Sequence, residues 1–503
     1  MIQVSIIFEL VRAHPRTMFW LITLTQAALW WLMPSLFYAA PPGDLPFVLA
    51  IGHEFQLGSY LGPPLAFWLA EIAYDIGGMP AVYLLSQLCV VATYWAVFEL
   101  GCATVGVAHA VIAVMLMVGV VAFSLPTPEF GPPVLAVALT ALIMLHFWKA
   151  AAQTKRLYWA AVGVEAGLLL LTSYVGLILY ATIAAFMLIT QRGRALLGSV
   201  EPWLAGVVVV VFGFPHLIWL DAQGSLVAPV LDRLGEGLAT MRLVDRAGLP
   251  ARILFAHAGL IVLVALAAGW GIKPPQRVPV FQRPSVHPFA RHFIYTFAIA
   301  PLAIATLLAL VLGEPDPVGG VAPLIVLSAL AVVACAGDTI TVNRDQLLGI
   351  VWGAMLVAPP IIVALAILVL PPITGAEFAV TQPANAIGRY FSEAFSRRTG
   401  KDLEIAAGEP RLAALVALKS RPRASLYLDA TPQRSPWVDA RDVSQKGAIV
   451  VWNAPDTATP PPSEIKARFP ALTPDVPRAF DRFTLTGKPT LRIGWGIIRP
   501  GGQ

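Results

Sequence analysis

The sequence has few charged residues. Asp, Glu, Lys and Arg make up 13% of its 503 residues, and 57% of the residues are hydrophobic. Soluble domains carry about 25% charged residues. Because the apolar residues also fall in long runs, the composition excludes a chain of ordinary soluble domains and indicates a polytopic membrane protein.

Cysteine is also scarce. The three cysteines, Cys89, Cys102 and Cys335, lie in or beside apolar segments, and the polar C-terminal part has none. This distribution excludes a disulfide framework. No Cys-x-x-Cys pair or Cys/His cluster predicts a metal or haem site, so no cofactor is expected, although dependence on a divalent cation is left open.

The apolar runs predict eleven membrane spans, since a span needs roughly 17–25 residues. Arg12 and Arg16 precede the first run, and no small-x-small cleavage site follows it closely, so we interpret this run as an uncleaved span. The predicted spans are residues 17–38, 79–99, 104–125, 132–149, 157–171, 174–190, 202–220, 251–271, 292–312, 319–337 and 347–370.

The distribution of basic residues predicts the orientation of these spans. With the N-terminus in the cytoplasm, twelve Lys and Arg residues fall on the inner side and four on the outer side before residue 371. This asymmetry follows the positive-inside rule. We therefore expect a multi-pass membrane protein with residues 39–78 and the C-terminal part on the outer side of the membrane.

The composition changes at Pro371-Pro372. From there on, eighteen Lys and Arg residues face twelve Asp and Glu residues. The stretches "LEIAAG", "ASLYLDA", "GAIVVWN" and "LRIGWGIIRP" predict strands, and "PANAIGRYFSEAFSRRTG" and "EPRLAALVALKS" predict helices, the first ending at Gly400. The expected domains are a membrane part, 1–370, and a small extracytoplasmic α/β domain, 371–503. The positive charge of the latter fits anionic headgroups or a phosphorylated glycolipid, or an ordinary basic surface.

The outer segment 41–74, "PPGDLPFVLAIGHEFQLGSYLGPPLAFWLAEIAY", contains three carboxylates and no Lys or Arg. Residues 63–78 predict a helix on the outer membrane surface rather than a span. Carboxylates at the outer ends of the helices are either solvated loop charges or the lining of one cavity, where a carboxylate can act as a general base. They are Asp44, Glu54, Glu71, Glu129 and Asp221.

These motifs resemble those of the family 39 glycosyltransferases, which include protein O-mannosyltransferases and the aminoarabinose transferases that modify lipid A. Asp44 matches the catalytic Asp of the family, and Pro63-Pro64-Leu65 matches its proline pair. The similarity continues to about residue 225 through "SLPTPEFGPP", "GLLLLTSYVGLILY" and the segment ending in "IWLDAQG". It implies the GT-C architecture, a polyprenyl-phosphate sugar donor, and a glycolipid, lipopolysaccharide or protein acceptor, with no nucleic acid.

Several positions differ from the family pattern. Leu45 stands where the family usually has Glu, and Ser173 stands where many members have a Lys placed to meet the lipid phosphate. Gly62 replaces a polar residue, and Asp221 replaces an Asn. These differences imply another substrate or a reduced activity.

The resemblance implies an inverting displacement in which Asp44 takes the proton of the acceptor. The departing phosphate then needs cationic groups near it. Arginines suit this role because they form paired hydrogen bonds with phosphate. The candidates are Arg233, Arg242 and Arg246, which could equally be solvated residues of a loop helix, or an arginine of the C-terminal domain.

Other polar residues have weaker assignments. His53 and Glu54 could bind sugar hydroxyls or a metal, although two neighbouring residues are a weak metal signal. Tyr174 matches a family Tyr and is expected to line the cavity near the lipid phosphate. Glu165 lies within a predicted span, where carboxylates are costly and often functional, or it pairs there with a Trp or Tyr donor. His146 and His216 are expected to pack between helices.

Three functions remain open from the sequence. The first is a glycosyltransferase, and the second is a non-catalytic relative that binds a glycolipid or a partner enzyme. The third is a transporter of lipid-linked sugars, but such proteins usually contain paired repeats, and the sequence has no convincing internal repeat.

Overall fold

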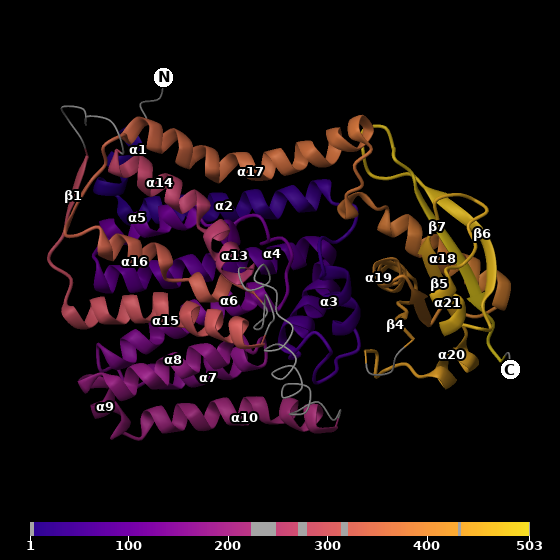
Figure 1. Ribbon diagram of the computed structural model, residues 1–503, viewed down its shortest axis with the longest axis horizontal. Helices are drawn as coiled ribbons and strands as arrows, with labels where there is room; N and C mark the ends of the chain where they lie inside the picture. Colours follow the sequence, from indigo (N-terminus) through magenta and orange to yellow (C-terminus); the bar gives the residue numbers. More distant parts are fainter. Residues whose placement is uncertain (1–4, 223–247, 270–278, 313–319, 431–433, 502–503) are drawn as a thin grey trace. The chain divides into compact units, whose positions relative to one another are not determined.

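The computed structural model describes residues 5–222, 248–269, 279–312, 320–430 and 434–501. Contacts divide the chain into two compact units (Figure 1). The helical unit consists of Met1–Leu32 and Leu84–Pro360, and the mixed unit consists of Met33–Tyr83 and Ile361–Gln503. The segment after the first apolar helix therefore packs with the C-terminal residues. The predicted domain division between residues 370 and 371 stays a prediction.

The helical unit contains most of the apolar helices, and Figure 1 shows the long ones running roughly alongside one another. Helices α2, α4 and α17 contribute residues to both units. The elements of the helical unit, with these three shared helices, are α1 (Ser5–Ala13), α2 (Pro15–Phe37), α4 (Leu65–Thr104), α5 (Val107–Val118), η1 (Val121–Phe123), α6 (Pro132–Ala151), α7 (Tyr158–Leu170), α8 (Val175–Ile189), α9 (Gln191–Leu197), α10 (Glu201–Ala222), α13 (Gly248–Ala256), α14 (Ala258–Ala268), β1 (Val280–Gln282), α15 (Pro288–Leu312), η2 (Ala322–Ile325), α16 (Ser328–Cys335), β2 (Thr339–Thr341) and α17 (Asp345–Thr374).

The chain is a multi-pass membrane protein, and each of the eleven predicted spans contains a helix. Among the described residues, six helices are long and apolar enough to cross a membrane, and eight if each of two bent pairs counts as one span. Three further apolar helices are shorter than 18 residues: Val107–Val118, Tyr158–Leu170 and Ala322–Cys335. The count of eleven stays a prediction, because these three depend on the local thickness of the bilayer.

An aromatic cluster holds α6, α8 and α15 together. The rings of Phe293 and Phe297 lie 4.7 Å apart, and Phe147 and Phe186 pack against both. Such edge-on and tilted contacts add about 0.5–1.5 kcal/mol per pair beyond area burial. Where the hydrophobic effect between helices is weak, close packing of this kind supplies much of the association energy.

The mixed unit is built on a five-stranded sheet with strand order β4-β3-β5-β7-β6. Strand β3 pairs in parallel with β4 and β5, whereas β7 pairs antiparallel with β5 and β6. Apolar residues of α18 and α19 cover one face, and those of α20 and α21 cover the other. The elements are α3 (Leu45–Gly52), η3 (Ala379–Thr381), α18 (Ala384–Thr399), β3 (Ile405–Gly408), α19 (Pro410–Lys419), β4 (Ser425–Leu428), α20 (Ala440–Lys446), β5 (Ala448–Asn453), α21 (Ser463–Arg468), β6 (Thr473–Phe480) and β7 (Leu491–Ile498).

The four predicted strands are β3, β4, β5 and β7 of this sheet, and the two predicted helices are α18 and α19. Gly400 adopts the left-handed conformation and ends α18, as predicted. Strand β6 was not predicted, because Pro474 and Pro477 interrupt it. Proline is tolerated in a strand at a sheet edge, and β6 is an edge strand. The predicted loop "DTATPPPSEI" is wrong in its last three residues, which begin α21.

The outer segment folds as two helices of the mixed unit. Helix α3 follows Asp44, and the first part of α4 ends at Gly77 and Gly78, whose backbone is not helical. The predicted helix over 63–78 is thus present from Leu65. Its placement on the outer membrane surface stays a prediction.

Two glycine substitutions test how the sheet is packed. Gly408 has a φ of +113°, and a Cβ there would meet the carbonyl oxygen of Val451 at 2.0 Å. Gly400 has a φ of +70° but open space around it. We expect Gly400→Ala to cost about 1–2 kcal/mol from its backbone conformation alone. Gly408→Ala should cost about 3 kcal/mol or more, because overpacking adds to the strain.

Thermal melting of the detergent-solubilised chain gives the comparison. The expected order of melting temperatures is wild type, then Gly400→Ala, then Gly408→Ala. Equal melting temperatures for the two variants would mean that β3 and β5 are not in the close contact described.

Candidate active site

Asp44 stands at the start of α3, in the mixed unit, with its side chain exposed. Its carbonyl oxygen accepts the backbone N–H groups of Phe47 and Val48 at 2.9 and 3.0 Å, so the residue occupies the position before the first helical turn. The carboxylate does not cap the helix. Its oxygens therefore do not serve as the N-terminal cap and can meet a molecule from outside.

Contacts with α19 fix the backbone that carries Asp44. Arg411 donates from Nη1 to the carbonyl of Gly43 at 2.6 Å and from Nη2 to that of Pro41 at 2.7 Å. On α3, Phe47 and Ala50 pack into the core beneath α18 and α19. Because a planar guanidinium can bind two acceptors in one geometry, this clamp holds the approach to Asp44 in one conformation.

A polar cluster lies beside Asp44. The guanidinium of Arg434 lies 4.4 Å from the ring centre of Tyr60, and Arg434 also pairs with Asp429. Burial raises the pKa of the Tyr60 hydroxyl; Arg434 opposes this rise, and the carboxylates of Asp44 and Asp429 add to it. The carboxylate of Asp44 thus acts electrostatically on Tyr60, a hydroxyl that also has the cation of Arg434 over its ring.

A second cluster is buried where α3 and α4 meet the C-terminal residues. Glu71 is 1% exposed and pairs with Arg423, and its Oε1 lies 3.0 Å from Nδ1 of His53. Arg423 also donates to the carbonyl of Leu49 at 3.2 Å and lies over the ring of Tyr74. A buried carboxylate needs such partners, because an unpaired charge in the interior is very costly. His53 and Glu71 are therefore structural partners here.

Glu54 lies at the edge of this buried cluster. Burial raises its pKa above the ordinary value of 4.5, against the effects of a hydrogen bond with Ser425 and the charges of His53 and Arg423. Its Oε1 has no hydrogen-bond partner among the described residues. Glu54 thus has one buried oxygen left for a proton or a ligand.

The remaining candidates belong to the helical unit. Glu129 precedes α6, and Asp221 is exposed in the last turn of α10. Tyr174 precedes α8, and its hydroxyl lies 2.9 Å from Nε2 of the buried His216. Arg233, Arg242 and Arg246 lie outside the described residues. That these residues line one cavity with Asp44 stays a prediction.

Glu165 and Ser173 have partners that the sequence did not predict. Glu165 pairs with Nδ1 of His146 at 2.7 Å, so the expected Trp or Tyr donor is wrong. The ring of His146 in turn stacks on Tyr158. Ser173, at the position of the family Lys, is buried and accepts the backbone N–H of Val175. The hydroxyl of Ser173 therefore binds a backbone N–H in the first turn of α8.

Sequence reasoning left the arginines of the C-terminal part unassigned. Arg411, Arg423 and Arg434 reach the outer segment, but they stand more than 350 residues from their partners in it. Only the positive charge of the C-terminal part opposite the carboxylates of 41–74 hinted at this. No local motif identifies which arginine meets which residue.

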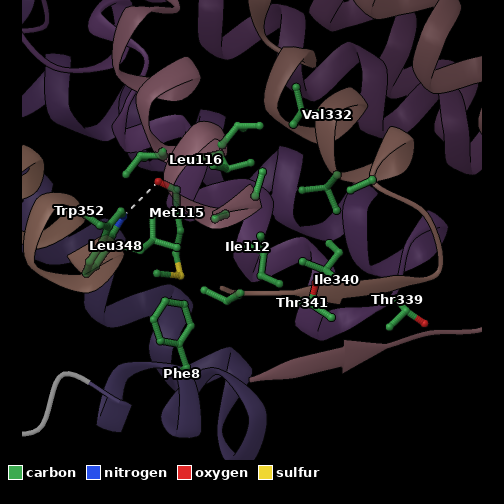
Figure 2. A pocket seen from close by; sticks show the side chains of 17 residues that line it. Phe8, Ile112, Met115, Leu116, Val332, Thr339, Ile340, Thr341, Leu348 and Trp352 are labelled. Carbon is green, nitrogen blue, oxygen red and sulfur yellow. Dashed lines mark hydrogen bonds between the residues drawn. The ribbon is translucent and has the colours of Figure 1, made fainter. Parts of the chain in front are cut away.

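A cavity of about 240 Å³ in the helical unit has a different character (Figure 2). Phe8, Ile112, Met115 and Leu116 line it together with residues of α14, α16, β2 and α17, and Trp352 donates to the carbonyl of Met115 at 3.0 Å. Such a lining offers a sugar few hydrogen bonds. Among the described residues, no group of three or more His, Cys, Asp or Glu could hold a metal ion.

The buried ion pair gives a first prediction for this site. Arg423→Gln leaves Glu71 without its cation, and removing one partner of a buried pair costs about 3–5 kcal/mol. Arg397→Gln breaks an exposed pair with Glu393 and should cost about 0–1 kcal/mol. The double variant Glu71→Leu/Arg423→Met should recover most of the stability, because no buried charge then remains.

Melting temperatures of the wild type and the three variants in one detergent provide the measurement. A double variant as unstable as Arg423→Gln would show that the loss of stability does not come from an unpaired Glu71.

Glu54 gives a second prediction, on pH. Its folded pKa is raised, so the folded chain binds this proton more tightly than the unfolded chain does. The resulting stability is fully present below the ordinary pKa and is lost as the pH rises through the folded value. Glu54→Gln should therefore flatten the fall in melting temperature over that window, whereas Glu464→Gln, at an exposed position, should keep the wild-type profile. A wild-type profile in Glu54→Gln would mean that another group titrates.

Comparison with known proteins agrees with the sequence motifs. Residues 62–219 match the model of the family described as dolichyl-phosphate-mannose-protein mannosyltransferase. No curated protein sequence matches the chain. The chain is 12% identical to ArnT from Cupriavidus metallidurans bound to undecaprenyl phosphate, with 96% of this chain and 99% of that chain covered and a TM-score of 0.47.

The archaeal oligosaccharyltransferase AglB from Archaeoglobus fulgidus, in complex with an inhibitory peptide and a dolichol-phosphate, is also 12% identical. Here 88% of this chain and 70% of that chain are covered, with a TM-score of 0.40. Since the family match covers residues 62–219, it includes Pro63-Pro64-Leu65 and Tyr174 but not Asp44. The resemblance of this membrane protein to the family 39 glycosyltransferases is thereby confirmed.

Proposed function

We propose that the chain is a membrane glycosyltransferase that moves a sugar from a polyprenyl-phosphate donor to a glycolipid, lipopolysaccharide or protein acceptor. Asp44 is its general base. The observation that carries this proposal is the exposed carboxylate of Asp44 on a backbone held by Arg411. The family match over residues 62–219 supports the reaction class, and the motif resemblance supports the donor and the role of Asp44.

In the proposed reaction, the acceptor oxygen attacks the anomeric carbon while the bond from that carbon to the phosphate oxygen breaks. The two bonds lie on opposite faces of the sugar, so the configuration inverts. Asp44 accepts the proton of the attacking hydroxyl, which requires about 2.6–3.2 Å between the two oxygens. Solvent then takes this proton, and the polyprenyl phosphate leaves as an anion.

The charge of the departing phosphate needs a partner. Ser173 carries no charge, and its hydroxyl binds the backbone N–H of Val175. An arginine must therefore balance the charge of the phosphate. Arg233, Arg242 and Arg246 are candidates by their place in the sequence, and Arg434 is a candidate because it lies over Tyr60 beside Asp44. A guanidinium held by an aromatic ring keeps its donors directed outward, which suits a phosphate.

The proposed setting is the outer face of a bacterial inner membrane. The distribution of Lys and Arg supports eleven spans with the N-terminus in the cytoplasm. In this arrangement residues 39–78 and 371–503 are periplasmic. The donor and acceptor would then meet Asp44 on the side where lipid-linked sugars are used.

One observation favours a non-catalytic relative that binds a glycolipid. Leu45, at the position of the usual family Glu, is fully buried. The side chain at this position therefore packs in the core, and the site lacks the carboxylate that the family usually has there. A transporter of lipid-linked sugars is supported by no described feature.

Asp44→Asn separates these functions. A deletion strain is complemented with wild type, Asp44→Asn or Asp75→Asn, and the envelope lipids, lipopolysaccharide and envelope proteins are compared by mass spectrometry. Asp75 is an exposed carboxylate in the first part of α4 and is the matched control. We expect the wild type and Asp75→Asn to restore a sugar that the deletion removes, whereas Asp44→Asn lowers its transfer by about 10²–10⁴-fold.

Equal amounts of folded protein in the membrane are required for the comparison. Full transfer by Asp44→Asn contradicts the base role. If the deletion removes no sugar from any fraction, the non-catalytic function is favoured instead.

A further inference from the structure

A polar cavity of about 580 Å³ lies within the mixed unit, and Asp44 is not among its lining residues. This volume falls in the range of roughly 300–1,000 Å³ that is typical of small-molecule sites. Its lining comes from the segment before α18, the start of α19, the end of β5 and the start of β7. The residues are Glu377, Ala379, Gln382, Glu409, Arg411, Asn453, Ala454, Pro455, Arg482, Thr490, Leu491 and Arg492.

The topology of the sheet places this cavity at a position that favours ligands. From β3 the chain runs through α19 to β4 on one side, and then through α20 to β5 on the other side of β3. The carboxyl ends of β3 and β5 are therefore a point where the strand order reverses. In open α/β sheets, ligands bind in the crevice outside the carboxyl ends of the strands at such a point.

Three arginines line this crevice, against two glutamates that already have partners. Glu377 pairs with Arg482 at 2.5 Å, and Glu409 accepts the backbone N–H of Leu412 at 2.7 Å as the cap of α19. The side chain of Arg482 is only 2% exposed. Burying a guanidinium so deeply is costly unless its donors are used.

Two of these guanidinium groups have a donor left over. The Nε of Arg482 and the Nε of Arg492 are buried and have no hydrogen-bond partner among the described residues. Arg492 donates from Nη1 to the carbonyl of Pro455 at 2.7 Å. Arg482 donates from Nη1 to the carbonyl of Phe378 at 3.2 Å. These bonds to main-chain carbonyls hold both groups in place, as a preorganised anion site requires.

We propose that this crevice binds a phosphoryl group through Arg482, Arg492 and Arg411. A phosphate monoester carries more than one negative charge and three acceptor oxygens, which matches several guanidinium donors around one cavity. The source of the group is a free phosphate compound or the headgroup of a phosphorylated lipid. The site does not depend on the proposed glycosyl transfer.

The site also connects with the backbone that carries Asp44. Arg411 lines the crevice and binds the carbonyls of Gly43 and Pro41. A bound phosphoryl group would therefore stabilise the conformation of Arg411 that holds this backbone. Binding that favours one conformation raises the population of that conformation.

The test is phosphate binding by the purified full chain. Melting temperatures are measured in detergent with increasing inorganic phosphate at constant ionic strength, and separately in nanodiscs with phosphatidic acid or with phosphatidylcholine alone. The variants are Arg492→Gln, which removes a donor group, and Thr490→Glu, which adds a negative charge at an exposed position of the lining. Arg441→Gln, at an exposed position of α20, is the matched control.

We expect a saturable rise in melting temperature for the wild type and Arg441→Gln, with the midpoint shifted at least about tenfold in both crevice variants. A response to inorganic phosphate identifies a free phosphate compound as a sufficient source, and a response only to phosphatidic acid identifies the lipid headgroup. Thr490→Glu removes no hydrogen bond described here, so it separates loss of binding from loss of folding. No saturable response in the wild type, or equal responses in crevice variants and control, would overturn the proposal.

Discussion

The buried pair of Glu71 and Arg423 is the constraint on which the rest of the mixed unit depends. Glu71 belongs to the first part of α4, and Arg423 belongs to the turn before β4, so the pair joins two segments 352 residues apart. A carboxylate that is 1% exposed destabilises the chain unless its cation is in place. The outer segment therefore cannot move away from the α/β residues without exposing or orphaning this charge, and its position beside β4 is specified by electrostatics as well as by packing.

This constraint explains why the α/β part matters for the proposed chemistry. Helix α3 rests on α19 through Phe47 and Ala50, and Arg411 binds the two carbonyls beside Asp44. A general base is effective only when it is held within hydrogen-bond reach of the reacting group. In this chain the rigid element behind the proposed base is a helix of the C-terminal α/β part, so the α/β residues hold the backbone of Asp44 in position.

The sequence predicted the parts of the structure that depend on local pattern. Apolar runs located a helix in every predicted span, and the alternation of strands and helices located the elements of the C-terminal part except η3, β6, α20 and α21. Motif resemblance selected Asp44, although the family match begins at residue 62. The partners of Glu71, Glu165 and the backbone at Gly43 could not be predicted, because each pairing depends on how distant helices pack. Of these, Glu165 shows the limit most plainly: its cost in a membrane span was predicted, but His146 as its partner was not.

Five arginines of the C-terminal part have two kinds of contact. Arg423 and Arg434 face the outer segment, where they meet Glu71 and Tyr60, whereas Arg482 and Arg492 line the crevice of the sheet. Arg411 takes part in both, since it lines the crevice and holds the backbone before Asp44. Most Lys and Arg residues of the C-terminal part are exposed, as the composition suggests, but Arg411, Arg423, Arg482 and Arg492 are at least partly buried. Because one guanidinium is shared, a ligand bound at the proposed crevice site would also favour the geometry at Asp44, and by thermodynamic reciprocity a substrate at Asp44 would favour binding in the crevice.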